Sequence, residues 1–199
     1  MQAEKNWNLG GMKMTEKLSE MSLEDLWKLF PIYLTEHQPC WEKWYAEEEK
    51  FLKDRVPNIE RISHIGSTAI HSICAKPIID ILVEISTEYP LLHDKELIVK
   101  SGYICMSEAS ERISFNKGYT EKGFADRVFH LHLRYVGDND ELYFRDYLME
   151  HANIAGEYEK MKLKLSQEYR FNRDGYTKAK TDFIQKYTER AKLKYGARY

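Results

Sequence analysis

The chain has 199 residues, of which 30 are basic and 32 acidic, and its formal net charge is −2. This balance does not favour a nucleic acid or an anionic membrane as the main partner. The three cysteines are far apart and form no Cys-x-x-Cys pair, which argues against a disulfide framework and a structural zinc site. No stretch approaches the roughly 20 apolar residues of a membrane-spanning helix. We therefore expect a soluble, cytoplasmic protein.

The hydrophobic fraction of 43% is sufficient for a sizeable core, and a single domain is the default at this length. We expect residues 1–20 to be a flexible segment and residues 21–199 to form one domain.

The first part of the chain alternates between helical and strand patterns. The first helix begins with a capping box, Ser22 followed by Asp25, and the second has an apolar stripe of tryptophan, tyrosine, phenylalanine and leucine. In chain order the predicted elements are a helix at 22–30, a short strand candidate at 31–37, a helix at 39–56, a strand at 59–65, a short helix at 67–74 and a strand at 78–85.

The second part begins with a helix and a hairpin and becomes entirely helical after about residue 141. In chain order the predicted elements are a helix at 91–102, paired strands at 103–109 and 112–118, a strong strand at 127–136, and helices at 141–151, 154–170 and 176–194. Helices around a mixed sheet of about five or six strands define one α+β or α/β domain with a C-terminal helical segment.

The turn Gly66-Ser67-Thr68 joins a predicted strand to a predicted helix. Unpaired N–H groups at such a helix start, together with the helix dipole, can bind phosphate or another anion. Gly66 permits close backbone approach, and Ser67 or Thr68 adds a hydroxyl. The alternative is a simple N-cap, because Ser and Thr are favoured there without any ligand.

Asp80 lies within an otherwise apolar strand, where a carboxylate requires a partner. Strand alternation places Asp80, Leu82 and Glu84 on one face. Asp80 and Glu84 near a phosphate-binding turn could hold a divalent cation, since Mg²⁺ favours one or two carboxylates with substrate phosphate oxygens. Alternatively, Asp80 pairs with Lys76 or a nearby arginine.

His130, His132 and Arg134 share one face of the strand at 127–136 by the same alternation. Two histidines spaced in this way can ligate a transition metal or act as acid and base. The alternative is the exposed face of a half-buried strand, which also alternates with polar residues.

Several segments resemble the GrpB family, which lies within the nucleotidyltransferase superfamily. The most specific is "HIGSTAIHSICAKPIIDILVEI" at 64–85, and "FHLHLRY", "FRDYLMEH" and "YTKAKTDFI" resemble later blocks. The resemblance covers about residues 20–190. It implies an α+β fold with a nucleotidyltransferase-like mixed sheet flanked by helices.

The resemblance also implies a site. Gly66 and Ser67 match the turn that receives nucleotide phosphates, and Asp80 matches the first metal-binding carboxylate. The superfamily's second carboxylate would stand two residues later, where this chain has Leu82. Glu84 lies one more pleat along, roughly 6–7 Å from that position by strand rise.

The third superfamily carboxylate is replaced by His130 and His132. We therefore expect catalytic and metal-binding roles for Asp80, His130 and His132, with Glu84 as a further candidate ligand. Mixed Asp and His ligation leans toward Mn²⁺, Zn²⁺ or Fe²⁺ rather than Mg²⁺. The expected cofactor is a divalent metal, Mg²⁺ or Mn²⁺, with Zn²⁺ as a further option.

Four basic residues are candidates for contacts with a phosphate chain: Lys76, Lys117, Arg127 and Lys180. For any lone basic residue the alternative is plain solvation.

These patterns indicate a protein that binds a nucleotide or another phosphorylated small molecule with a divalent metal. The activity that the resemblance implies is transfer of a nucleotidyl group. Leu82 favours an alternative, a non-catalytic ligand-binding or partner-docking protein on the same fold. The histidine pair favours a metal-dependent hydrolase. RNA binding is the weakest of these hypotheses, since only the last helix is basic and no aromatic platform accompanies it.

Overall fold

A five-stranded mixed sheet is the centre of the computed structural model, which describes residue 18 and residues 20–199. The strand order is β1-β2-β5-β4-β3; β2 and β5 are parallel, and the other neighbours are antiparallel. The strands are β1 (Ile59–Ile65), β2 (Ile79–Ile85), β3 (Ile104–Glu108), β4 (Arg112–Thr120) and β5 (Gly123–Tyr135). The segment expected to be flexible lies mostly outside the described residues.

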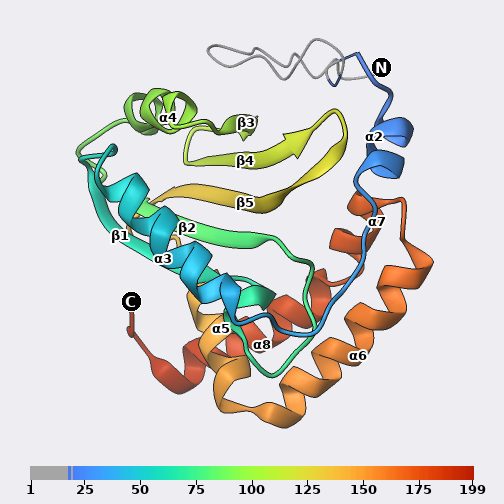
Figure 1. Cartoon of the computed structure of the whole chain (residues 1–199). Helices are drawn as coiled ribbons and strands as arrows, with labels where there is room; N and C mark the ends of the chain where they lie inside the picture. The colour runs from blue at the N-terminus through green and yellow to red at the C-terminus, as the bar shows by residue number, and fades with distance from the viewer. Residues whose placement is uncertain (1–17, 19) are drawn as a thin grey trace, which may run out of the picture.

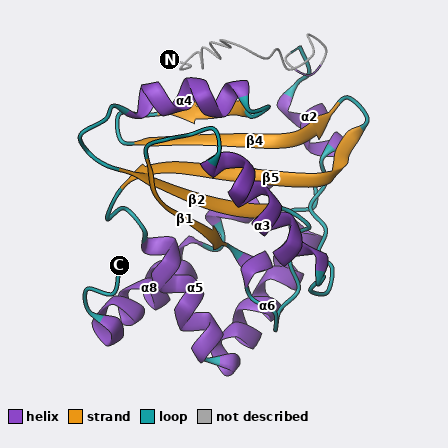
Figure 2. Cartoon of the chain, turned by 60° about the vertical axis from the view of Figure 1, so that its left-hand side comes forward, coloured by secondary structure: helices purple, strands orange, loops and turns teal. Residues whose placement is uncertain are grey.

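Helices lie on both sides of this sheet (Figures 1 and 2). Along the chain they are α2 (Leu23–Leu29), α3 (Cys40–Lys53), α4 (Leu91–Lys100), α5 (Asp140–Glu150), α6 (Ala152–Glu168), α7 (Arg173–Lys178) and α8 (Thr181–Tyr195). The predicted α+β architecture with a C-terminal helical segment is confirmed. In the described part of the chain, no helix combines the length and apolar character needed to cross a membrane.

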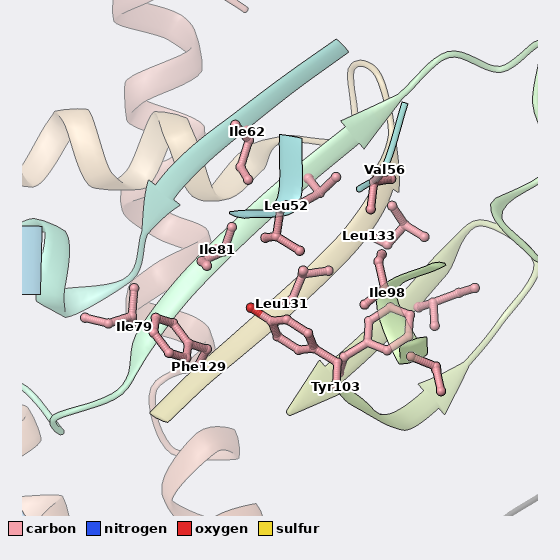
Figure 3. Close-up of a cluster of buried hydrophobic side chains, with 14 of the residues drawn as sticks. Leu52, Val56, Ile62, Ile79, Ile81, Ile98, Tyr103, Phe129, Leu131 and Leu133 are labelled. Atoms are coloured by element: carbon pink, nitrogen blue, oxygen red, sulfur yellow. The ribbon is translucent and has the colours of Figure 1, made fainter. Parts of the chain in front are cut away.

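One face of the sheet forms the main core with α3 and α4 (Figure 3). Ile79 and Ile81 of β2 and Leu131 of β5 are no more than 3% exposed, and they pack near Leu52 of α3 and Ile98 of α4. Each such side chain contributes about 1.5–3 kcal/mol when it is fully buried. The apolar residues of the alternating strands therefore hold this face of the sheet against α3 and α4.

The strand residues that alternate with these lie on the opposite face of the sheet, toward the C-terminal helices. Leu82 lies on this face, fully buried against Ile65 of β1 and Leu142 of α5. The position that would hold a second superfamily carboxylate is thus part of a small apolar cluster.

Several predicted elements differ from the observed ones. The strand candidate at 31–37 is only an isolated bridge between Thr35 and Ala75, and the predicted helix at 67–74 is a three-residue 3₁₀ helix, η1 (Ser67–Ala69). The chain leaves helical geometry at Ile70, whose side chain enters a cluster with Leu148 and Tyr158. Packing against α5 and α6 has overridden local helix preference here. The predicted last helix is divided into α7 and α8 at residues 179–180.

The first helix begins as predicted. The hydroxyl of Ser22 accepts a hydrogen bond from the backbone N–H of Asp25 at 3.1 Å, which satisfies one of the free donors at the start of α2.

Candidate functional site

A pocket of about 880 Å³ lies between the polar face of the sheet and helices α5 to α8. Its lining includes most of the residues that the sequence singles out, together with several helical residues that it does not. The predicted residues that the pocket brings together are Gly66, Ser67, Thr68, Lys76, Asp80, His130, His132 and Lys180.

Asp80 and His130 form the floor of the pocket. They are directly paired in the register between β2 and β5, and His130 Nδ1 lies 3.2 Å from Asp80 Oδ1. Burial alone would raise the pKa of Asp80, but the hydrogen bond from His130 and the basic groups around the carboxylate, including Lys76, together outweigh burial and lower that pKa to about 2. Burial lowers the pKa of His130, against the opposing effect of Asp80. Asp80 is therefore an anion at neutral pH.

The other nitrogen of the His130 ring, Nε2, contacts the hydroxyl of Tyr119 on β4. This hydroxyl lies 2.8 Å from His130 Nε2, and it accepts a hydrogen bond of 2.8 Å from Arg173 Nη2. Both nitrogens of His130 thus have protein partners in this structure. His130 orients Asp80 here, and it could ligate a metal only by giving up one of these contacts.

Gly66 is required by the close approach of the turn to Asp80. Its φ is +70°, and a Cβ built there would lie 2.3 Å from Asp80 Oδ2. A side chain at residue 66 would therefore collide with the carboxylate, in addition to straining the backbone.

Thr68 has a structural role in this turn. Its hydroxyl donates to the carbonyl of Ile78 at 3.2 Å and contacts His64 Nε2 at 2.9 Å, and the residue is 1% exposed. Because η1 has only three residues, the predicted phosphate site at the start of a helix is wrong in its physical basis. Ser67 remains in the lining, near the Tyr158 hydroxyl.

Three lysines converge on the pocket from separate segments of the chain. Burial lowers the pKa of Lys76 to about 7, helped by the charges of Arg173 and Lys180. It lowers the pKa of Lys162 to about 7 and that of Lys180 to about 8, and Lys180 also repels Lys162. Burial and mutual repulsion therefore disfavour the charged forms of these lysines, and a bound anion would favour them again.

Aromatic rings support these lysines. Lys180 Nζ lies 4.3 Å and Lys76 Nζ 5.4 Å from the centre of the Tyr176 ring, on α7. Lys162 Nζ lies 4.9 Å from the centre of the Tyr158 ring and donates to the carbonyl of Cys74. Stacking of this kind offsets part of the desolvation of each ammonium group.

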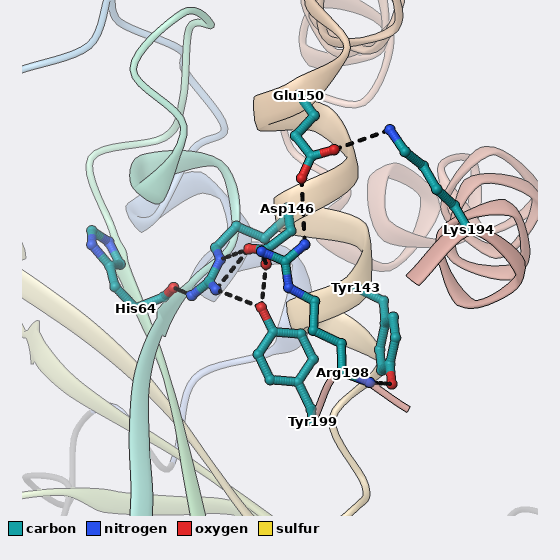
Figure 4. A network of polar contacts seen from close by, with 8 residues as sticks. His64, Tyr143, Asp146, Glu150, Lys194, Arg198 and Tyr199 are labelled. Atoms are coloured by element: carbon teal, nitrogen blue, oxygen red, sulfur yellow. Dashed lines mark hydrogen bonds and ion pairs between the residues drawn. The ribbon is translucent and has the colours of Figure 1, made fainter. Parts of the chain in front are cut away.

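Arg145 also lines the pocket, but its charge is already paired. It donates to Asp146 Oδ1 at 2.8 Å and to the carbonyl of His64 at 2.8 Å. Asp146 in turn contacts Arg198 and Tyr199, so α5 is tied to the last residues of the chain (Figure 4). We assign Arg145 to the scaffold of the site.

Glu84 does not belong to this pocket, and the expectation that it ligates the same metal as Asp80 is wrong. It is fully buried, pairs with Arg61, and accepts hydrogen bonds from Asn139 at 3.0 Å and from the Gly137 N–H at 3.1 Å. Burial would raise the pKa of Glu84, but hydrogen bonds from Arg61 and the other donors lower it. Its binding capacity is used within the fold.

Lys117 and Arg127 are also outside the pocket, so the structure does not bring them together with the other predicted phosphate contacts. Lys117 lies on the opposite face of the sheet, 2.7 Å from Glu48 of α3. Arg127 lies 2.5 Å from Glu47 on the same helix. Strand alternation explains Arg127, because odd-numbered residues of β5 such as Phe129 face α3, whereas His130 faces the pocket.

The residues present do not form a metal centre made by the protein alone. Within residues 18 and 20–199, no three His, Cys, Asp or Glu side chains are arranged to hold a metal ion. Asp80 retains Oδ2, and its side chain is 28% exposed. His132 lines the pocket with a pKa that burial lowers to about 4, so its ring is neutral. The donor set therefore fits a cation held jointly with ligand oxygens.

Sequence reasoning missed Lys162, Arg173 and Tyr119. Lys162 falls in a helix rich in lysine, and nothing in its spacing distinguishes it from its solvated neighbours. Its 2% exposure arises only when α6 packs against residues 73–76. Tyr119 and Arg173 meet across 54 residues of sequence.

These features define an α+β protein with a lysine-lined pocket between a mixed sheet and a C-terminal helical layer. The chain belongs to the GrpB family, whose model, described as GrpB protein, matches residues 31–190.

Curated relatives and a solved structure agree with this membership. The chain is 31% identical over 160 residues to the glutamate-rich protein GrpB of Alkalihalophilus pseudofirmus, an alignment that covers 77% of this chain and 91% of that protein. It is 31% identical over 185 residues to YqkA of Bacillus subtilis, covering 89% of this chain but only 53% of YqkA. The crystal structure of the conserved protein GrpB from Enterococcus faecalis superposes with a TM-score of 0.71 at 31% identity, covering 82% of this chain and 99% of that one.

Proposed function

We propose that this pocket binds the phosphate chain of a nucleotide or another phosphorylated small molecule. The observation that carries the proposal is the convergence of Lys76, Lys162 and Lys180 on one pocket, with Arg173 beside them and Asp80 at the floor. An anion among these groups would relieve their mutual repulsion and form charge-assisted hydrogen bonds. The volume of about 880 Å³ falls within the range of small-molecule sites, about 300–1,000 Å³.

The lysines are better suited to a polyphosphate than to a single phosphate. They come from the segment before β2, from α6 and from the start of α8, so they surround the pocket rather than form one cluster. Their lowered pKa values also mean that binding an anion brings protons with it. Oligophosphates are therefore the first class to test.

A divalent cation, Mg²⁺ or Mn²⁺, would bind Asp80 Oδ2 together with phosphate oxygens, with His132 as a candidate further ligand. Mg²⁺ commonly uses one or two carboxylates and completes its shell with water and substrate phosphates. Zn²⁺ fits less well, since catalytic zinc sites normally have three protein ligands. When bound, the cation would polarise a phosphoryl oxygen.

Nucleotidyl transfer is the most specific activity that we propose for this pocket, with an acceptor still to be identified. The burial of Leu82 favours a second candidate, a non-catalytic ligand-binding or partner-docking protein on the same fold. Two-metal chemistry would require a second carboxylate from elsewhere. A metal-dependent hydrolase is supported less. A metal held by both histidines would require His130 to give up its contact with the Tyr119 hydroxyl.

Thermal shift measurements test the proposal. Nucleotides and phosphorylated metabolites would be screened with and without Mg²⁺ and Mn²⁺. A ligand at 100 times its dissociation constant stabilises the folded state by about 2.7 kcal/mol, which shifts the melting temperature by several degrees. Asp80→Asn should remove the effect of the metal and keep part of the effect of the anion. The absence of any shift with every phosphorylated compound would contradict the proposal.

A further inference from the structure

Four side chains from four elements form a continuous line of polar contacts at the pocket floor. Arg173 Nη2 of α7 donates to the Tyr119 hydroxyl of β4 at 2.8 Å. That hydroxyl lies 2.8 Å from His130 Nε2 of β5, and His130 Nδ1 lies 3.2 Å from Asp80 Oδ1 of β2. The line begins at a helix in the C-terminal layer and ends at the carboxylate.

The hydrogen-bonding chemistry of the two end groups, Arg173 and Asp80, indicates which atom donates in each contact of this line. A guanidinium only donates hydrogen bonds, so the Tyr119 oxygen accepts from Arg173. At the other end of the line, the ionised Asp80 carboxylate only accepts hydrogen bonds, so His130 Nδ1 donates to it. In the neutral imidazole Nε2 is then an acceptor, and the hydroxyl proton of Tyr119 points at it.

We propose that Tyr119 and Arg173 are positioning residues that hold His130 in the tautomer that donates to Asp80. The proposal rests on the proposed function of Asp80 as the cation-binding carboxylate. With Oδ1 held by His130, the second oxygen, Oδ2, is directed toward Gly66, where a Cβ would approach it to 2.3 Å. The orientation of the free carboxylate oxygen is therefore set by a residue on α7.

The surroundings of Tyr119 allow the role of its hydroxyl to be tested separately from the packing of its ring. Its ring centre lies 4.7 Å from that of Phe30 and 5.3 Å from that of Phe124, so the ring has an apolar role of its own. A phenylalanine would keep those contacts and remove only the hydroxyl. Tyr33 is a matched control: it contacts the same Phe124 ring at 6.5 Å, is 43% exposed and does not line the large pocket.

The first measurement is the tautomer of His130 in the ligand-free full chain, read from long-range ¹H–¹⁵N correlations of the imidazole. The signal is assigned by its loss in His130→Gln. In the wild type we expect the proton on Nδ1. Tyr119→Phe should move a large share of the population to the Nε2-protonated form, and Tyr33→Phe should leave it unchanged. Arg173→Gln, which keeps the hydroxyl, should shift the tautomer in the same direction by a smaller amount.

The second measurement is the affinity for Mn²⁺ in the presence of inorganic tripolyphosphate. Tyr119→Phe should weaken Mn²⁺ binding by about 3- to 30-fold, the range of one hydrogen bond of about 0.6–2 kcal/mol to a ligating group. Tyr33→Phe should bind as the wild type does. An unchanged affinity in Tyr119→Phe would overturn the positioning role.

The tautomer measurement needs no ligand, so it tests the hydrogen-bonded line even if the pocket binds no phosphate. A wild-type ring protonated on Nε2, or an unchanged tautomer in both Tyr119→Phe and Arg173→Gln, would overturn the proposal. If instead the tautomer shifts as expected but no Mn²⁺ or tripolyphosphate binds, the line stands and the proposed function fails.

Discussion

His130 and Asp80 are directly paired between the parallel strands β5 and β2, with Nδ1 and Oδ1 3.2 Å apart. This pairing helps to keep Asp80 ionised at the floor of the pocket. It leaves the second carboxylate oxygen, Oδ2, available to a ligand. Lys76, Lys162 and Lys180 line the same pocket, and burial lowers the pKa of each, so a bound anion would favour their charged forms. We propose that this site receives negative charge at one end and a metal ion beside it.

The lysines predict a characteristic pH dependence of stability. The folded-state pKa of Lys162 is about 7, below its ordinary value, so between pH 7 and 10 the unfolded state binds more protons than the folded state. The free energy of unfolding of the ligand-free protein should therefore rise with pH across this window. In Lys162→Met the rise should be smaller, because one contributing group is gone. Urea denaturation at pH 6.5, 8.0 and 9.0 measures this, and equal pH slopes for the two proteins would contradict it.

Gly66→Ala should impair both stability and binding. The added Cβ would meet Asp80 Oδ2, and the backbone would be strained at φ +70°. Gly137→Ala is the matched control, because Gly137 has φ +94° but nothing within 4 Å of an added Cβ. We expect strain of about 1 kcal/mol in the control and about 1–2 kcal/mol more in Gly66→Ala. Equal losses of unfolding free energy would show that the contact with Asp80 is unimportant.

Leu82→Asp should not create a second metal-binding carboxylate. Leu82 is fully buried with Ile65 and Leu142, so an aspartate would place an unpaired charge in an apolar cluster. We expect a loss of more than about 3 kcal/mol in unfolding free energy, whereas Leu82→Met should lose less than about 1.5 kcal/mol. A stable Leu82→Asp protein with tighter Mn²⁺ binding would contradict this account of the site.

Glu84→Gln should destabilise the fold without affecting the pocket. Arg61 loses its charged partner, and the hydrogen bonds from Asn139 and Gly137 weaken. The expected loss is about 2–3 kcal/mol by urea denaturation. Mn²⁺ affinity in the presence of tripolyphosphate should stay at the wild-type value, whereas Asp80→Asn should lose it. Reduced Mn²⁺ binding in a folded Glu84→Gln protein would restore Glu84 as a ligand.

The sequence predicted the strands that carry the site because their alternation is strong. Period alone places Asp80 with Glu84 on one face of its strand and His130 with His132 on one face of another strand. The register between β2 and β5 then makes Asp80 and His130 neighbours. The same alternation, applied to Arg127, would have placed it on the opposite face. Alternation therefore separates Arg127 from the pocket that His130 faces.

Other features depend on packing that no local pattern encodes. The segment at 70–75 is irregular because Ile70 and Ile73 enter a cluster with α5 and α6. Glu84 differs from Asp80 only through its partners, Arg61 and Asn139, which are 23 and 55 residues away. Lys162 and Arg173 join the pocket only through the arrangement of the C-terminal helices.

Isothermal titration of inorganic tripolyphosphate into the protein at pH 7 and low salt tests the central claim most directly. Lys180 lines the pocket, whereas Lys178, two residues earlier, is exposed and lies outside it. We predict that the wild type binds, that Lys180→Met binds about 10- to 100-fold more weakly through loss of a charge-assisted contact, and that Lys178→Met stays within about 2-fold of the wild type. No binding by the wild type, or equal losses in the two variants, would contradict a phosphate-binding pocket between the sheet and the C-terminal helices.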